Sequence, residues 1–273
     1  MNPGISGRTR VFGLVGHPVR HSLSPEMHTA LFRQLGLDAV YLAFDVDPRR
    51  SDQVADSIRT LDLVGVNLTV PFKERVLPFL DHCTIAAQEA GAVNCVINVD
   101  GHLTGYNTDG AGLLGALDEE HQFQPANRRC AVLGAGGAGR AVAASLVAGG
   151  AQVTLFNRTL ARAAAACERI AARPRSLAPE SFDEPFELIV NCLGGGAEDL
   201  VESLPLGSLP AHAIWCDVNY WMPDPPRVRA CRAAGLRVSE GLGMLLHQGA
   251  LSFELFTGHP VSPSDLRAAL SVK

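Results

Sequence analysis

Apolar and polar residues follow one another along this chain in a pattern that predicts short strands and helices. In the first half, apolar runs rich in β-branched residues predict strands at residues 10–15, 40–46, 64–70, 93–99 and 103–106. Helices are predicted at residues 24–35, 51–61, 73–80 and from 109 to about 120. Asp100-Gly101 lies between the last two strands and is a favoured turn pair, so it predicts a hairpin there.

The second half repeats a strict alternation of strand and helix. Strands are predicted at residues 131–133, 151–156, 186–192, 213–218 and 237–238. Helices are predicted from residue 140 onward and at 160–173, 228–234, 242–256 and 263–270. This alternation predicts an α/β fold with a parallel, doubly wound sheet. Residues 123–129, with Pro125 and Asn127, are predicted to link the two halves.

A glycine pattern follows the first strand of the second half. Gly134, Gly136 and Gly139 have G-x-G-x-x-G spacing, after a strand and before an alanine-rich helix. Such glycines allow a tight turn, close approach of the backbone to a pyrophosphate, and close packing of helix on strand. The N-terminus of the helix offers N–H groups and partial positive charge to phosphates. We therefore predict a dinucleotide site at this turn.

The end of the next strand indicates which dinucleotide binds. An NAD-binding unit places Asp or Glu there, where it holds the ribose hydroxyl. Here the strand at 151–156 is followed by Asn157, Arg158 and Thr159, and then by Arg162. Guanidinium groups suit a phosphate and also stack on adenine, so we predict NADP rather than NAD. The alternative is that both arginines are solvated residues on a helix surface.

Composition limits the kinds of function that are open. The chain has 273 residues, 47% of them hydrophobic and 19% charged, which allows two domains with sizeable cores. Its net charge is −5 and it has no basic run, which argues against nucleic acid as a partner. The seven cysteines are scattered without metal-like spacing, so we expect buried thiols, a reducing cytoplasm and no metal.

Other sequence features bear on targeting and assembly. The segment MNPGISGRTR at residues 1–10 contains no apolar run, so we expect no signal peptide. No stretch approaches the roughly 18 uninterrupted apolar residues of a membrane span, so no membrane partner is expected. The sequence leaves open whether the protein is a monomer or a homodimer.

Two stretches of the first half carry candidate polar sites. Ser24 with Pro25 and Glu26 predicts a helix start in which the Ser24 hydroxyl caps the helix. Ser22 is not needed for that cap, so the two hydroxyls beside a helix N-terminus also form a possible carboxylate site.

Asn67 and Thr69 share one face of a predicted strand, pointing to solvent or into a cleft. Lys73 follows this strand, and its side chain is either solvated at the surface or part of the same cleft. Asp109 similarly either caps the next helix or belongs to a site.

Eight segments together resemble the shikimate dehydrogenase family. They are HSLSP at 21–25, NLTVPFK at 67–73, GAVN at 91–94, GYNTDG at 105–110, GAGGAGRA at 134–141, NRTLAR at 157–162, DVNY at 217–220 and GLGMLLHQGALSFELFTG at 241–258. The resemblance implies an enzyme with a small-molecule substrate. It would reduce 3-dehydroshikimate to shikimate with NADPH, a step toward chorismate and the aromatic amino acids. It also implies an N-terminal α/β substrate domain at 1–110, completed by 243–273, and a Rossmann-type NADP domain at 111–242.

The resemblance also assigns roles by position. Lys73 is similar to the catalytic lysine of the family and Asp109 to its partner. The residues that would hold the substrate carboxylate are Ser22, Ser24 and Tyr220. Those that would line the pocket for the ring hydroxyls are Asn67, Thr69, Asn94, Thr108 and Gln248. The pyrophosphate turn would be Gly134, Ala135, Gly136, Gly137 and Ala138. The adenosine-phosphate clamp would be Asn157, Arg158, Thr159 and Arg162, and Val218 and Gly241 would flank the nicotinamide.

Two segments depart from the pattern of the family. After Asn191 the family usually carries Thr-Ser, whereas this chain has the residues CLGGG at 192–196. Segment 219–226 lacks the usual Thr-Pro and contains Trp221, and Cys95 and Thr29 replace a frequent Thr and Asn. Two alternatives stay open: a quinate/shikimate dehydrogenase, against which Ser24 and Arg158 count, and a non-catalytic NADP-binding regulator on the same scaffold.

Overall fold

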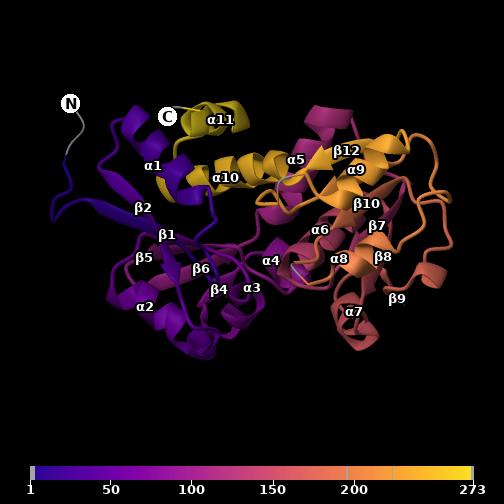
Figure 1. The fold of residues 1–273 in the computed structure, drawn as a ribbon. Coiled ribbons are helices and arrows are strands. Elements are labelled where there is room, and N and C mark those ends of the chain that lie inside the picture. The colour runs from indigo at the N-terminus through magenta and orange to yellow at the C-terminus, as the bar shows by residue number, and fades with distance from the viewer. Residues whose placement is uncertain (1–3, 195, 223, 272–273) are drawn as a thin grey trace. The chain divides into compact units, whose positions relative to one another are not determined.

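The computed structural model describes residues 4–194, 196–222 and 224–271 (Figure 1). Gly195 and Pro223, which belong to the two divergent segments, lie outside the described residues. The chain packs into two units. The first holds the chain up to Gln88, Ala92–Thr108, and the chain from Leu246 onward; the second holds Glu89–Gly91 and Asp109–Leu245. The domain limits 1–110, 111–242 and 243–273 stay a prediction.

The first unit contains a mixed sheet with strand order β2-β1-β3-β5-β6-β4. Its strands are β1 Arg10–Gly16, β2 Ala39–Asp45, β3 Gly65–Leu68, β4 His82–Cys83, β5 Cys95–Val99 and β6 His102–Tyr106. β1 pairs in parallel with β2 and β3, whereas β5 is antiparallel to β3 and β6. Asp100 and Gly101 both have positive φ, 52° and 85°, as a tight hairpin turn requires. The predicted hairpin is confirmed.

Helices cover both faces of this first sheet. They are α1 Ser24–Gln34, α2 Val54–Thr60, α3 Phe72–Arg75, α4 Ile85–Ala90, α10 Gly241–Thr257 and α11 Pro263–Ser271, with 3₁₀ turns at Pro48–Gln53 and Leu77–Phe79. α1, α10 and α11 lie above the sheet in Figure 1 and α2 below it. Phe12 of β1 packs against Phe32 of α1 and Phe256 of α10, each with ring centroids 5.2 Å apart. Val66 of β3 belongs instead to the buried cluster that contains Ile58 of α2.

Prolines explain why two predicted elements of the first unit are shorter than expected. The helix predicted at 73–80 ends after one turn, and Pro78 lies in the 3₁₀ turn that follows. Proline lacks an N–H group and its ring collides with the preceding helical turn, so the predicted continuous helix is wrong. The strand predicted at 64–70 covers only Gly65–Leu68 and stops before Pro71. The short elements β4 and α4 were not predicted.

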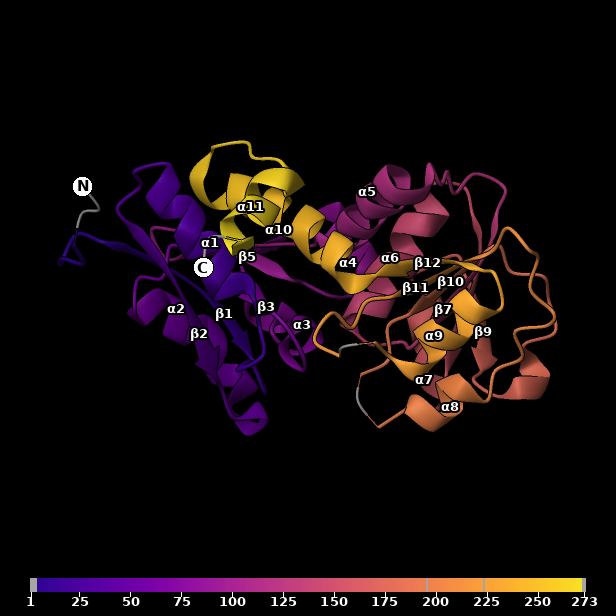
Figure 2. The ribbon, with the colours of Figure 1, turned by 45° about the horizontal axis from the view of Figure 1, so that its top comes forward.

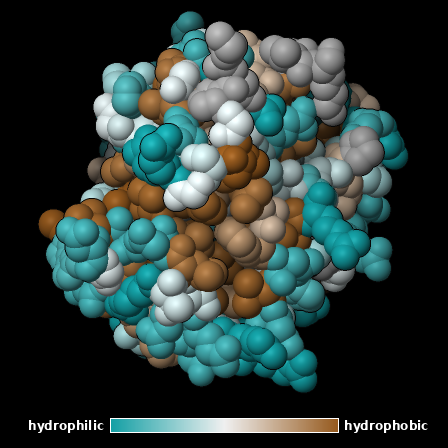
Figure 3. Space-filling model, turned by 90° about the vertical axis from the view of Figure 1, so that its left-hand side faces the viewer, coloured by the Kyte–Doolittle hydropathy of each residue, from teal (hydrophilic) through white to brown (hydrophobic). Residues whose placement is uncertain are grey.

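β2 forms one edge of the first sheet and presents apolar side chains to solvent. Leu42 in this strand is 43% exposed, and Leu61 after α2 is 63% exposed. Figure 3 shows hydrophobic surface gathered on this side of the first unit. An exposed edge strand is a template for pairing with another chain. The oligomeric state, monomer or homodimer, stays a prediction.

The second unit contains a parallel sheet with strand order β12-β11-β10-β7-β8-β9. The strands are β7 Arg129–Leu133, β8 Gln152–Asn157, β9 Arg173–Ser176, β10 Leu188–Asn191, β11 Ile214–Asp217 and β12 Arg237–Glu240. Every neighbouring pair is parallel. Numbered from β7, this is the 3-2-1-4-5-6 order of a Rossmann fold, in which the direction of winding reverses between β7 and β10. The predicted fold class is confirmed.

Helices also cover both faces of the second sheet. They are α5 Asp109–His121, α6 Gly137–Ala148, α7 Leu160–Cys167, α8 Glu198–Glu202 and α9 Pro226–Ala233. Leu117 of α5 and Leu146 of α6 share a buried cluster with Val132 of β7. Val201 of α8 and Val228 of α9 belong to the cluster on the opposite face. Figure 2 shows α5 and α6 on one side of this sheet and α8 and α9 on the other.

One helix of the second unit is shorter than predicted, and one was missed. The helix predicted at 160–173 ends at Cys167, and β9 begins at Arg173. Pro174 disfavours helical conformation at the residue before it and is tolerated in β9 because that strand is at the edge. The sequence did not predict α8. No helix in the described ranges is long and apolar enough to cross a membrane.

Candidate active site

The two serines of the first unit lie at the start of α1. The helix begins at Ser24, with Leu23 in the capping position and no side-chain cap. The prediction that the Ser24 hydroxyl caps the helix is therefore wrong by one position, because Ser24 already belongs to the first turn. The hydroxyl of Ser22 accepts a hydrogen bond from the Ser24 N–H at 3.2 Å. Two hydroxyls thus lie beside the N-terminus of an eleven-residue helix, where anions are favoured.

Thr69 and Lys73 follow β3. The Thr69 N–H donates to the carbonyl of Val15 at 2.9 Å, which holds this residue against the end of β1. A Cβ atom at Gly16 would lie 2.2 Å from the Thr69 methyl group, so glycine is needed there. Lys73 is half-buried on α3, and its carbonyl accepts the Val93 N–H at 2.8 Å. This bond ties the Lys73 backbone to the start of the β5 segment.

Asn94, Thr108 and Gln248 meet in a buried polar cluster of the first unit. The Asn94 Oδ1 atom accepts the Thr108 N–H at 2.7 Å, and Asn94 Nδ2 donates to Thr108 Oγ1 at 2.9 Å. The same Nδ2 atom also donates to Gln248 Oε1 at 3.5 Å. Residues from β5, the segment after β6, and α10 are thus joined by side-chain hydrogen bonds. The next residue, Asp109, is 3% exposed and begins α5. The pairing of Lys73 with Asp109 stays a prediction.

Asn67 extends this cluster through two residues that sequence reasoning missed. Its Oδ1 atom accepts a hydrogen bond from the Tyr41 hydroxyl at 2.8 Å, and its Nδ2 atom donates to Ser252 Oγ at 2.9 Å. Nδ2 also donates to the Asn94 carbonyl at 3.0 Å. Ser252 lies four positions after Gln248 in α10, so the two share one helix face. That spacing was the only local signal that could have indicated Ser252.

The glycine turn of the second unit requires glycine at two positions. Gly134 has φ of 106°, a conformation that other residues rarely adopt. A Cβ atom at Gly139 would lie 1.8 Å from the Gly134 carbonyl oxygen, which no side chain could tolerate. Gly136 precedes the first turn of α6. Ala135 is buried, whereas Gly137 and Ala138 are half-buried. The chain therefore makes a tight glycine turn just before the N-terminus of α6, the end of a helix where anions are favoured.

The four residues predicted to clamp the adenosine phosphate lie at the end of β8. Asn157 accepts the Ala135 N–H through Oδ1 at 3.1 Å and donates through Nδ2 to the Thr159 carbonyl at 2.9 Å. Asn157 therefore joins this strand end to the glycine turn. Arg158, Thr159 and Arg162 are exposed. Two cationic side chains and a hydroxyl group thus stand where an acidic residue would hold a ribose hydroxyl.

A network of amides and a carboxylate joins the ends of β10 and β11. Asn191 donates to the buried Asp217 carboxylate at 2.9 Å, and Asn219 Nδ2 donates to the same carboxylate at 2.8 Å. Asn219 Nδ2 also donates to the Leu193 carbonyl at 2.9 Å. The two segments that depart from the family pattern are therefore bonded to one another.

Val218 and Gly241 lie side by side after β11 and β12. A Cβ atom at Gly241 would lie 2.3 Å from the Val218 carbonyl oxygen and 2.9 Å from the Tyr220 backbone nitrogen, so only glycine fits there. The Tyr220 ring packs edge-on against Trp221, with ring centroids 5.4 Å apart. The positions predicted to flank a nicotinamide are thus neighbours within the second unit.

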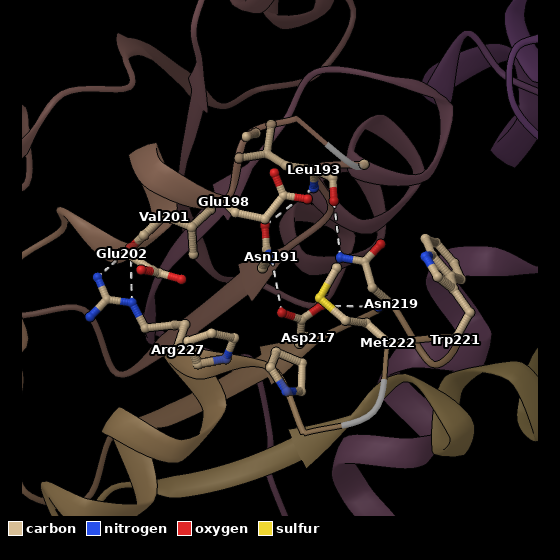
Figure 4. Close-up of a pocket in the computed structure, with 14 residues that line it drawn as sticks. Asn191, Leu193, Glu198, Val201, Glu202, Asp217, Asn219, Trp221, Met222 and Arg227 are labelled. Atoms are coloured by element: carbon tan, nitrogen blue, oxygen red, sulfur yellow. Dashed lines mark hydrogen bonds between the residues drawn. The ribbon is translucent and has the colours of Figure 1, made fainter.

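The divergent segments line a small pocket with α8 and α9, which Figure 4 shows. Arg227 lies in its wall and is only 6% exposed. Its guanidinium donates to the carbonyls of Val201 and Leu204 and lies 5.1 Å from the centre of the Trp215 ring. Burial lowers the pKa of Arg227, because the charged form loses hydration there. The position of this side chain suits a structural role, since it binds helix-end carbonyls.

Comparison with known proteins covers almost the whole chain. Family models match residues 14–96 as a shikimate dehydrogenase substrate binding domain, 118–187 as shikimate / quinate 5-dehydrogenase, and 241–270 as a shikimate 5'-dehydrogenase C-terminal domain. A relative from Symbiobacterium thermophilum named shikimate dehydrogenase (NADP(+)) is 42% identical, over 96% of this chain and 94% of its own length. This chain belongs to the shikimate dehydrogenase family.

Solved structures of the family share the two-domain fold. The shikimate dehydrogenase of Aquifex aeolicus matches with a TM-score of 0.88 and 34% identity, over 97% of this chain and 99% of that one. A shikimate 5-dehydrogenase from Thermus thermophilus, described in complex with NADP(H) and shikimate, matches with a TM-score of 0.81 and 39% identity, over 96% and 98% of the chains. Membership of the family establishes the fold, whereas the roles of the individual site residues stay predictions.

Proposed function

We propose that this chain is an NADP-dependent shikimate dehydrogenase, which reversibly reduces 3-dehydroshikimate to shikimate on the route to chorismate and the aromatic amino acids. The observation that carries the proposal is the 42% identity, over nearly the full length of both chains, to a protein named shikimate dehydrogenase (NADP(+)). The Thermus thermophilus structure described with NADP(H) and shikimate supports the same substrate and cofactor.

The residues of the second unit fit an NADP cofactor. The glycine turn leaves no room for a Cβ atom at Gly139, and α6 directs its first N–H groups toward the turn. Arg158 and Arg162 supply positive charge at the end of β8, where no carboxylate is present to repel a 2′-phosphate. We assign pyrophosphate binding to residues 134–138, phosphate binding to these arginines with Asn157 and Thr159, and the nicotinamide side to Val218 and Gly241. NADPH supplies the hydride for the reduction.

The residues of the first unit suit an anionic, hydroxylated ring. We assign the substrate carboxylate to the hydroxyls of Ser22 and Ser24, at the N-terminus of α1, with help from Tyr220. The ring hydroxyls are assigned to the polar side chains Asn67, Thr69, Asn94, Thr108 and Gln248. Hydrogen-bonding side chains of this kind select a polyhydroxylated substrate because an analogue without those hydroxyls leaves buried groups unsatisfied.

Lys73 is assigned as the general acid and base. When a carbonyl carbon is reduced, its oxygen gains negative charge and must take a proton; in the reverse direction, a hydroxyl must lose one. An ammonium group can give that proton and stabilise the developing negative oxygen. We assign Asp109 the role of holding the Lys73 ammonium and the substrate hydroxyl in one hydrogen-bond network.

An absorbance assay at the NADPH band tests the proposal directly. The protein is incubated with NADP⁺ and shikimate, with NADP⁺ and quinate, and with NADP⁺ alone. We expect NADPH to form with shikimate and not in the control without substrate. Equal or faster formation with quinate would identify a quinate/shikimate dehydrogenase instead. Tight NADPH binding without turnover of either acid would identify a non-catalytic NADP-binding protein.

The cellular location and assembly belong to the same proposal. We place the enzyme in the cytoplasm, which is supported by seven free cysteines, three of them only half-buried. Size-exclusion chromatography with light scattering distinguishes a monomer from a homodimer. The exposed β2 edge, with Leu42, is the edge at which we expect a second copy to pair if a homodimer forms.

A further inference from the structure

We propose that Ser252 and Tyr41 are positioning residues of the substrate pocket: both bond the oriented Asn67 amide, and Ser252 also holds the Thr108 hydroxyl. This inference rests on the proposed function, because Asn67 and Thr108 are assigned there to the ring hydroxyls of the substrate. Neither Ser252 nor Tyr41 is assigned a contact with substrate. Both are fully enclosed, at 0% and 1% exposure, so they act through the side chains that they hold.

The orientation of the Asn67 amide is fixed by a backbone carbonyl. The Asn94 carbonyl can only accept a hydrogen bond, so the Asn67 atom 3.0 Å from it must be Nδ2. The opposite atom is then Oδ1, which can only accept. The Tyr41 hydroxyl, 2.8 Å from Oδ1, must therefore donate its proton to Asn67. Removing that hydroxyl would leave Oδ1 without this donor in the interior of the first unit.

Ser252 joins the oriented Asn67 amide to Thr108. Asn67 Nδ2 donates its second proton to Ser252 Oγ at 2.9 Å. Ser252 Oγ lies 3.3 Å from Thr108 Oγ1 and forms a hydrogen bond with it, in which either hydroxyl can donate. Thr108 Oγ1 also accepts from Asn94 Nδ2 at 2.9 Å. The Thr108 hydroxyl in turn donates to Asn94 Oδ1 at 3.3 Å, so Asn94 and Ser252 together hold it in place.

The ring of Tyr41 is held in place by stacked aromatic side chains. The His28 ring lies 4.6 Å from it, with 15° between the planes, and the Phe253 ring stacks on the other side of His28 at 5.9 Å. Phe253 is the residue after Ser252 in α10. Helix α10 and strand β2 are therefore packed so that Tyr41 and Ser252 reach Asn67 from different elements. Such rigid support keeps polar groups in binding geometry.

Steady-state kinetics of three variants tests this inference. Ser252→Ala removes the acceptor for Asn67 and a hydrogen-bond partner of Thr108, and Tyr41→Phe removes one oxygen while keeping the ring. We expect each to raise KM for shikimate roughly tenfold, equivalent to about 1.4 kcal/mol. KM for NADP⁺ and kcat should change less than about twofold, because the lost contacts act equally in ground and transition states. Thr257→Ala is the matched control, since within the described chain its hydroxyl bonds the backbone near the end of α10.

The outcomes separate this inference from the proposed function. If the wild-type protein does not oxidise shikimate, the proposed function fails and the assignment of these two residues falls with it. If the wild type is active and a variant keeps the wild-type KM for shikimate, that residue has a structural role only, even when the melting temperature falls. If Ser252→Ala does not fold, the KM of Tyr41→Phe for shikimate decides whether the inference holds, because that variant keeps the packed aromatic ring.

Discussion

His28 should make the first unit sensitive to acid. Its imidazole is 0% exposed between the rings of Tyr41 and Phe253, and neither ring nitrogen has a hydrogen-bond partner in the described part of the chain. Burial lowers the pKa of His28 from 6.5 to about 3, because the charged form would lose its hydration. Between these values the unfolded chain binds a proton that the folded protein does not. The free energy of unfolding must therefore fall as pH falls below 6.5.

The size of this effect follows from the shift itself. Each pH unit between the two pKa values changes the free energy of unfolding by about 1.36 kcal/mol for one group. Lowering the pH from 7.5 to 4.5 crosses two units below the unfolded value of 6.5. The His28 contribution lost is therefore about 2.7 kcal/mol. This value holds as long as the pKa in the folded protein lies well below 4.5.

Urea unfolding of wild-type protein and His28→Phe, followed by far-UV circular dichroism at both pH values, measures this contribution. Phenylalanine keeps a flat ring in the stack and cannot take up a proton. We expect the wild type to lose about 2.7 kcal/mol more than His28→Phe between pH 7.5 and 4.5. His82→Gln, at an exposed histidine, is the control and should follow the wild type. Parallel loss of stability in wild type and His28→Phe would refute the reasoning.

Three further changes probe the assigned site. Lys73→Met should lower kcat by ~10²–10⁴ in either direction of the reaction, as loss of a general acid–base group does, and near-normal turnover would exclude Lys73 from the chemistry. Arg158→Ala should raise KM for NADPH about tenfold and leave KM for NADH unchanged, because a charged hydrogen bond to phosphate contributes ~1.5–3 kcal/mol. Equal use of NADPH and NADH by the wild type would contradict this. Gly139→Ala places a Cβ atom 1.8 Å from a backbone oxygen of the same turn and should weaken NADPH binding more than tenfold by calorimetry. Gly207→Ala, where a Cβ atom meets nothing within 4 Å, should bind normally.

Features specified by neighbouring residues were predictable from the sequence. The glycine turn, the hairpin at Asp100-Gly101 and the parallel sheet of the second unit each follow from local signals that the structure confirms. The helix predicted at 73–80 was too long, because Pro78 in that stretch cannot continue a helix and is a local signal for its end. The Ser24 cap was missed by one residue, which is within the ordinary uncertainty of helix ends.

Contacts between distant parts of the chain were not predictable in the same way. Asn67 is separated by 26 residues from Tyr41 and by 185 from Ser252, and nothing local in any of these stretches indicates the others. The bond between Asn219 and Leu193, 26 residues apart, is a further case. Sequence patterns indicated that segments 192–196 and 219–226 depart from the family. The fold was needed to find that described residues of the two segments are bonded to one another.

The polar interior of the first unit makes better sense as a site than as a core. Burying an amide or hydroxyl brings no stability beyond that of an apolar side chain of similar shape, even when every hydrogen bond is made. Yet this unit buries Asn67, Asn94, Thr108 and Ser252 together. Tyr41, which bonds Asn67, also stacks on His28, whose ring nitrogens have no hydrogen-bond partner among the described residues. Folds tolerate such local conflicts chiefly where function needs them. The Asn94 carbonyl, which can only accept, gives the Asn67 amide one orientation. That single orientation is what recognition of a hydroxylated ring requires, and apolar packing could not supply it.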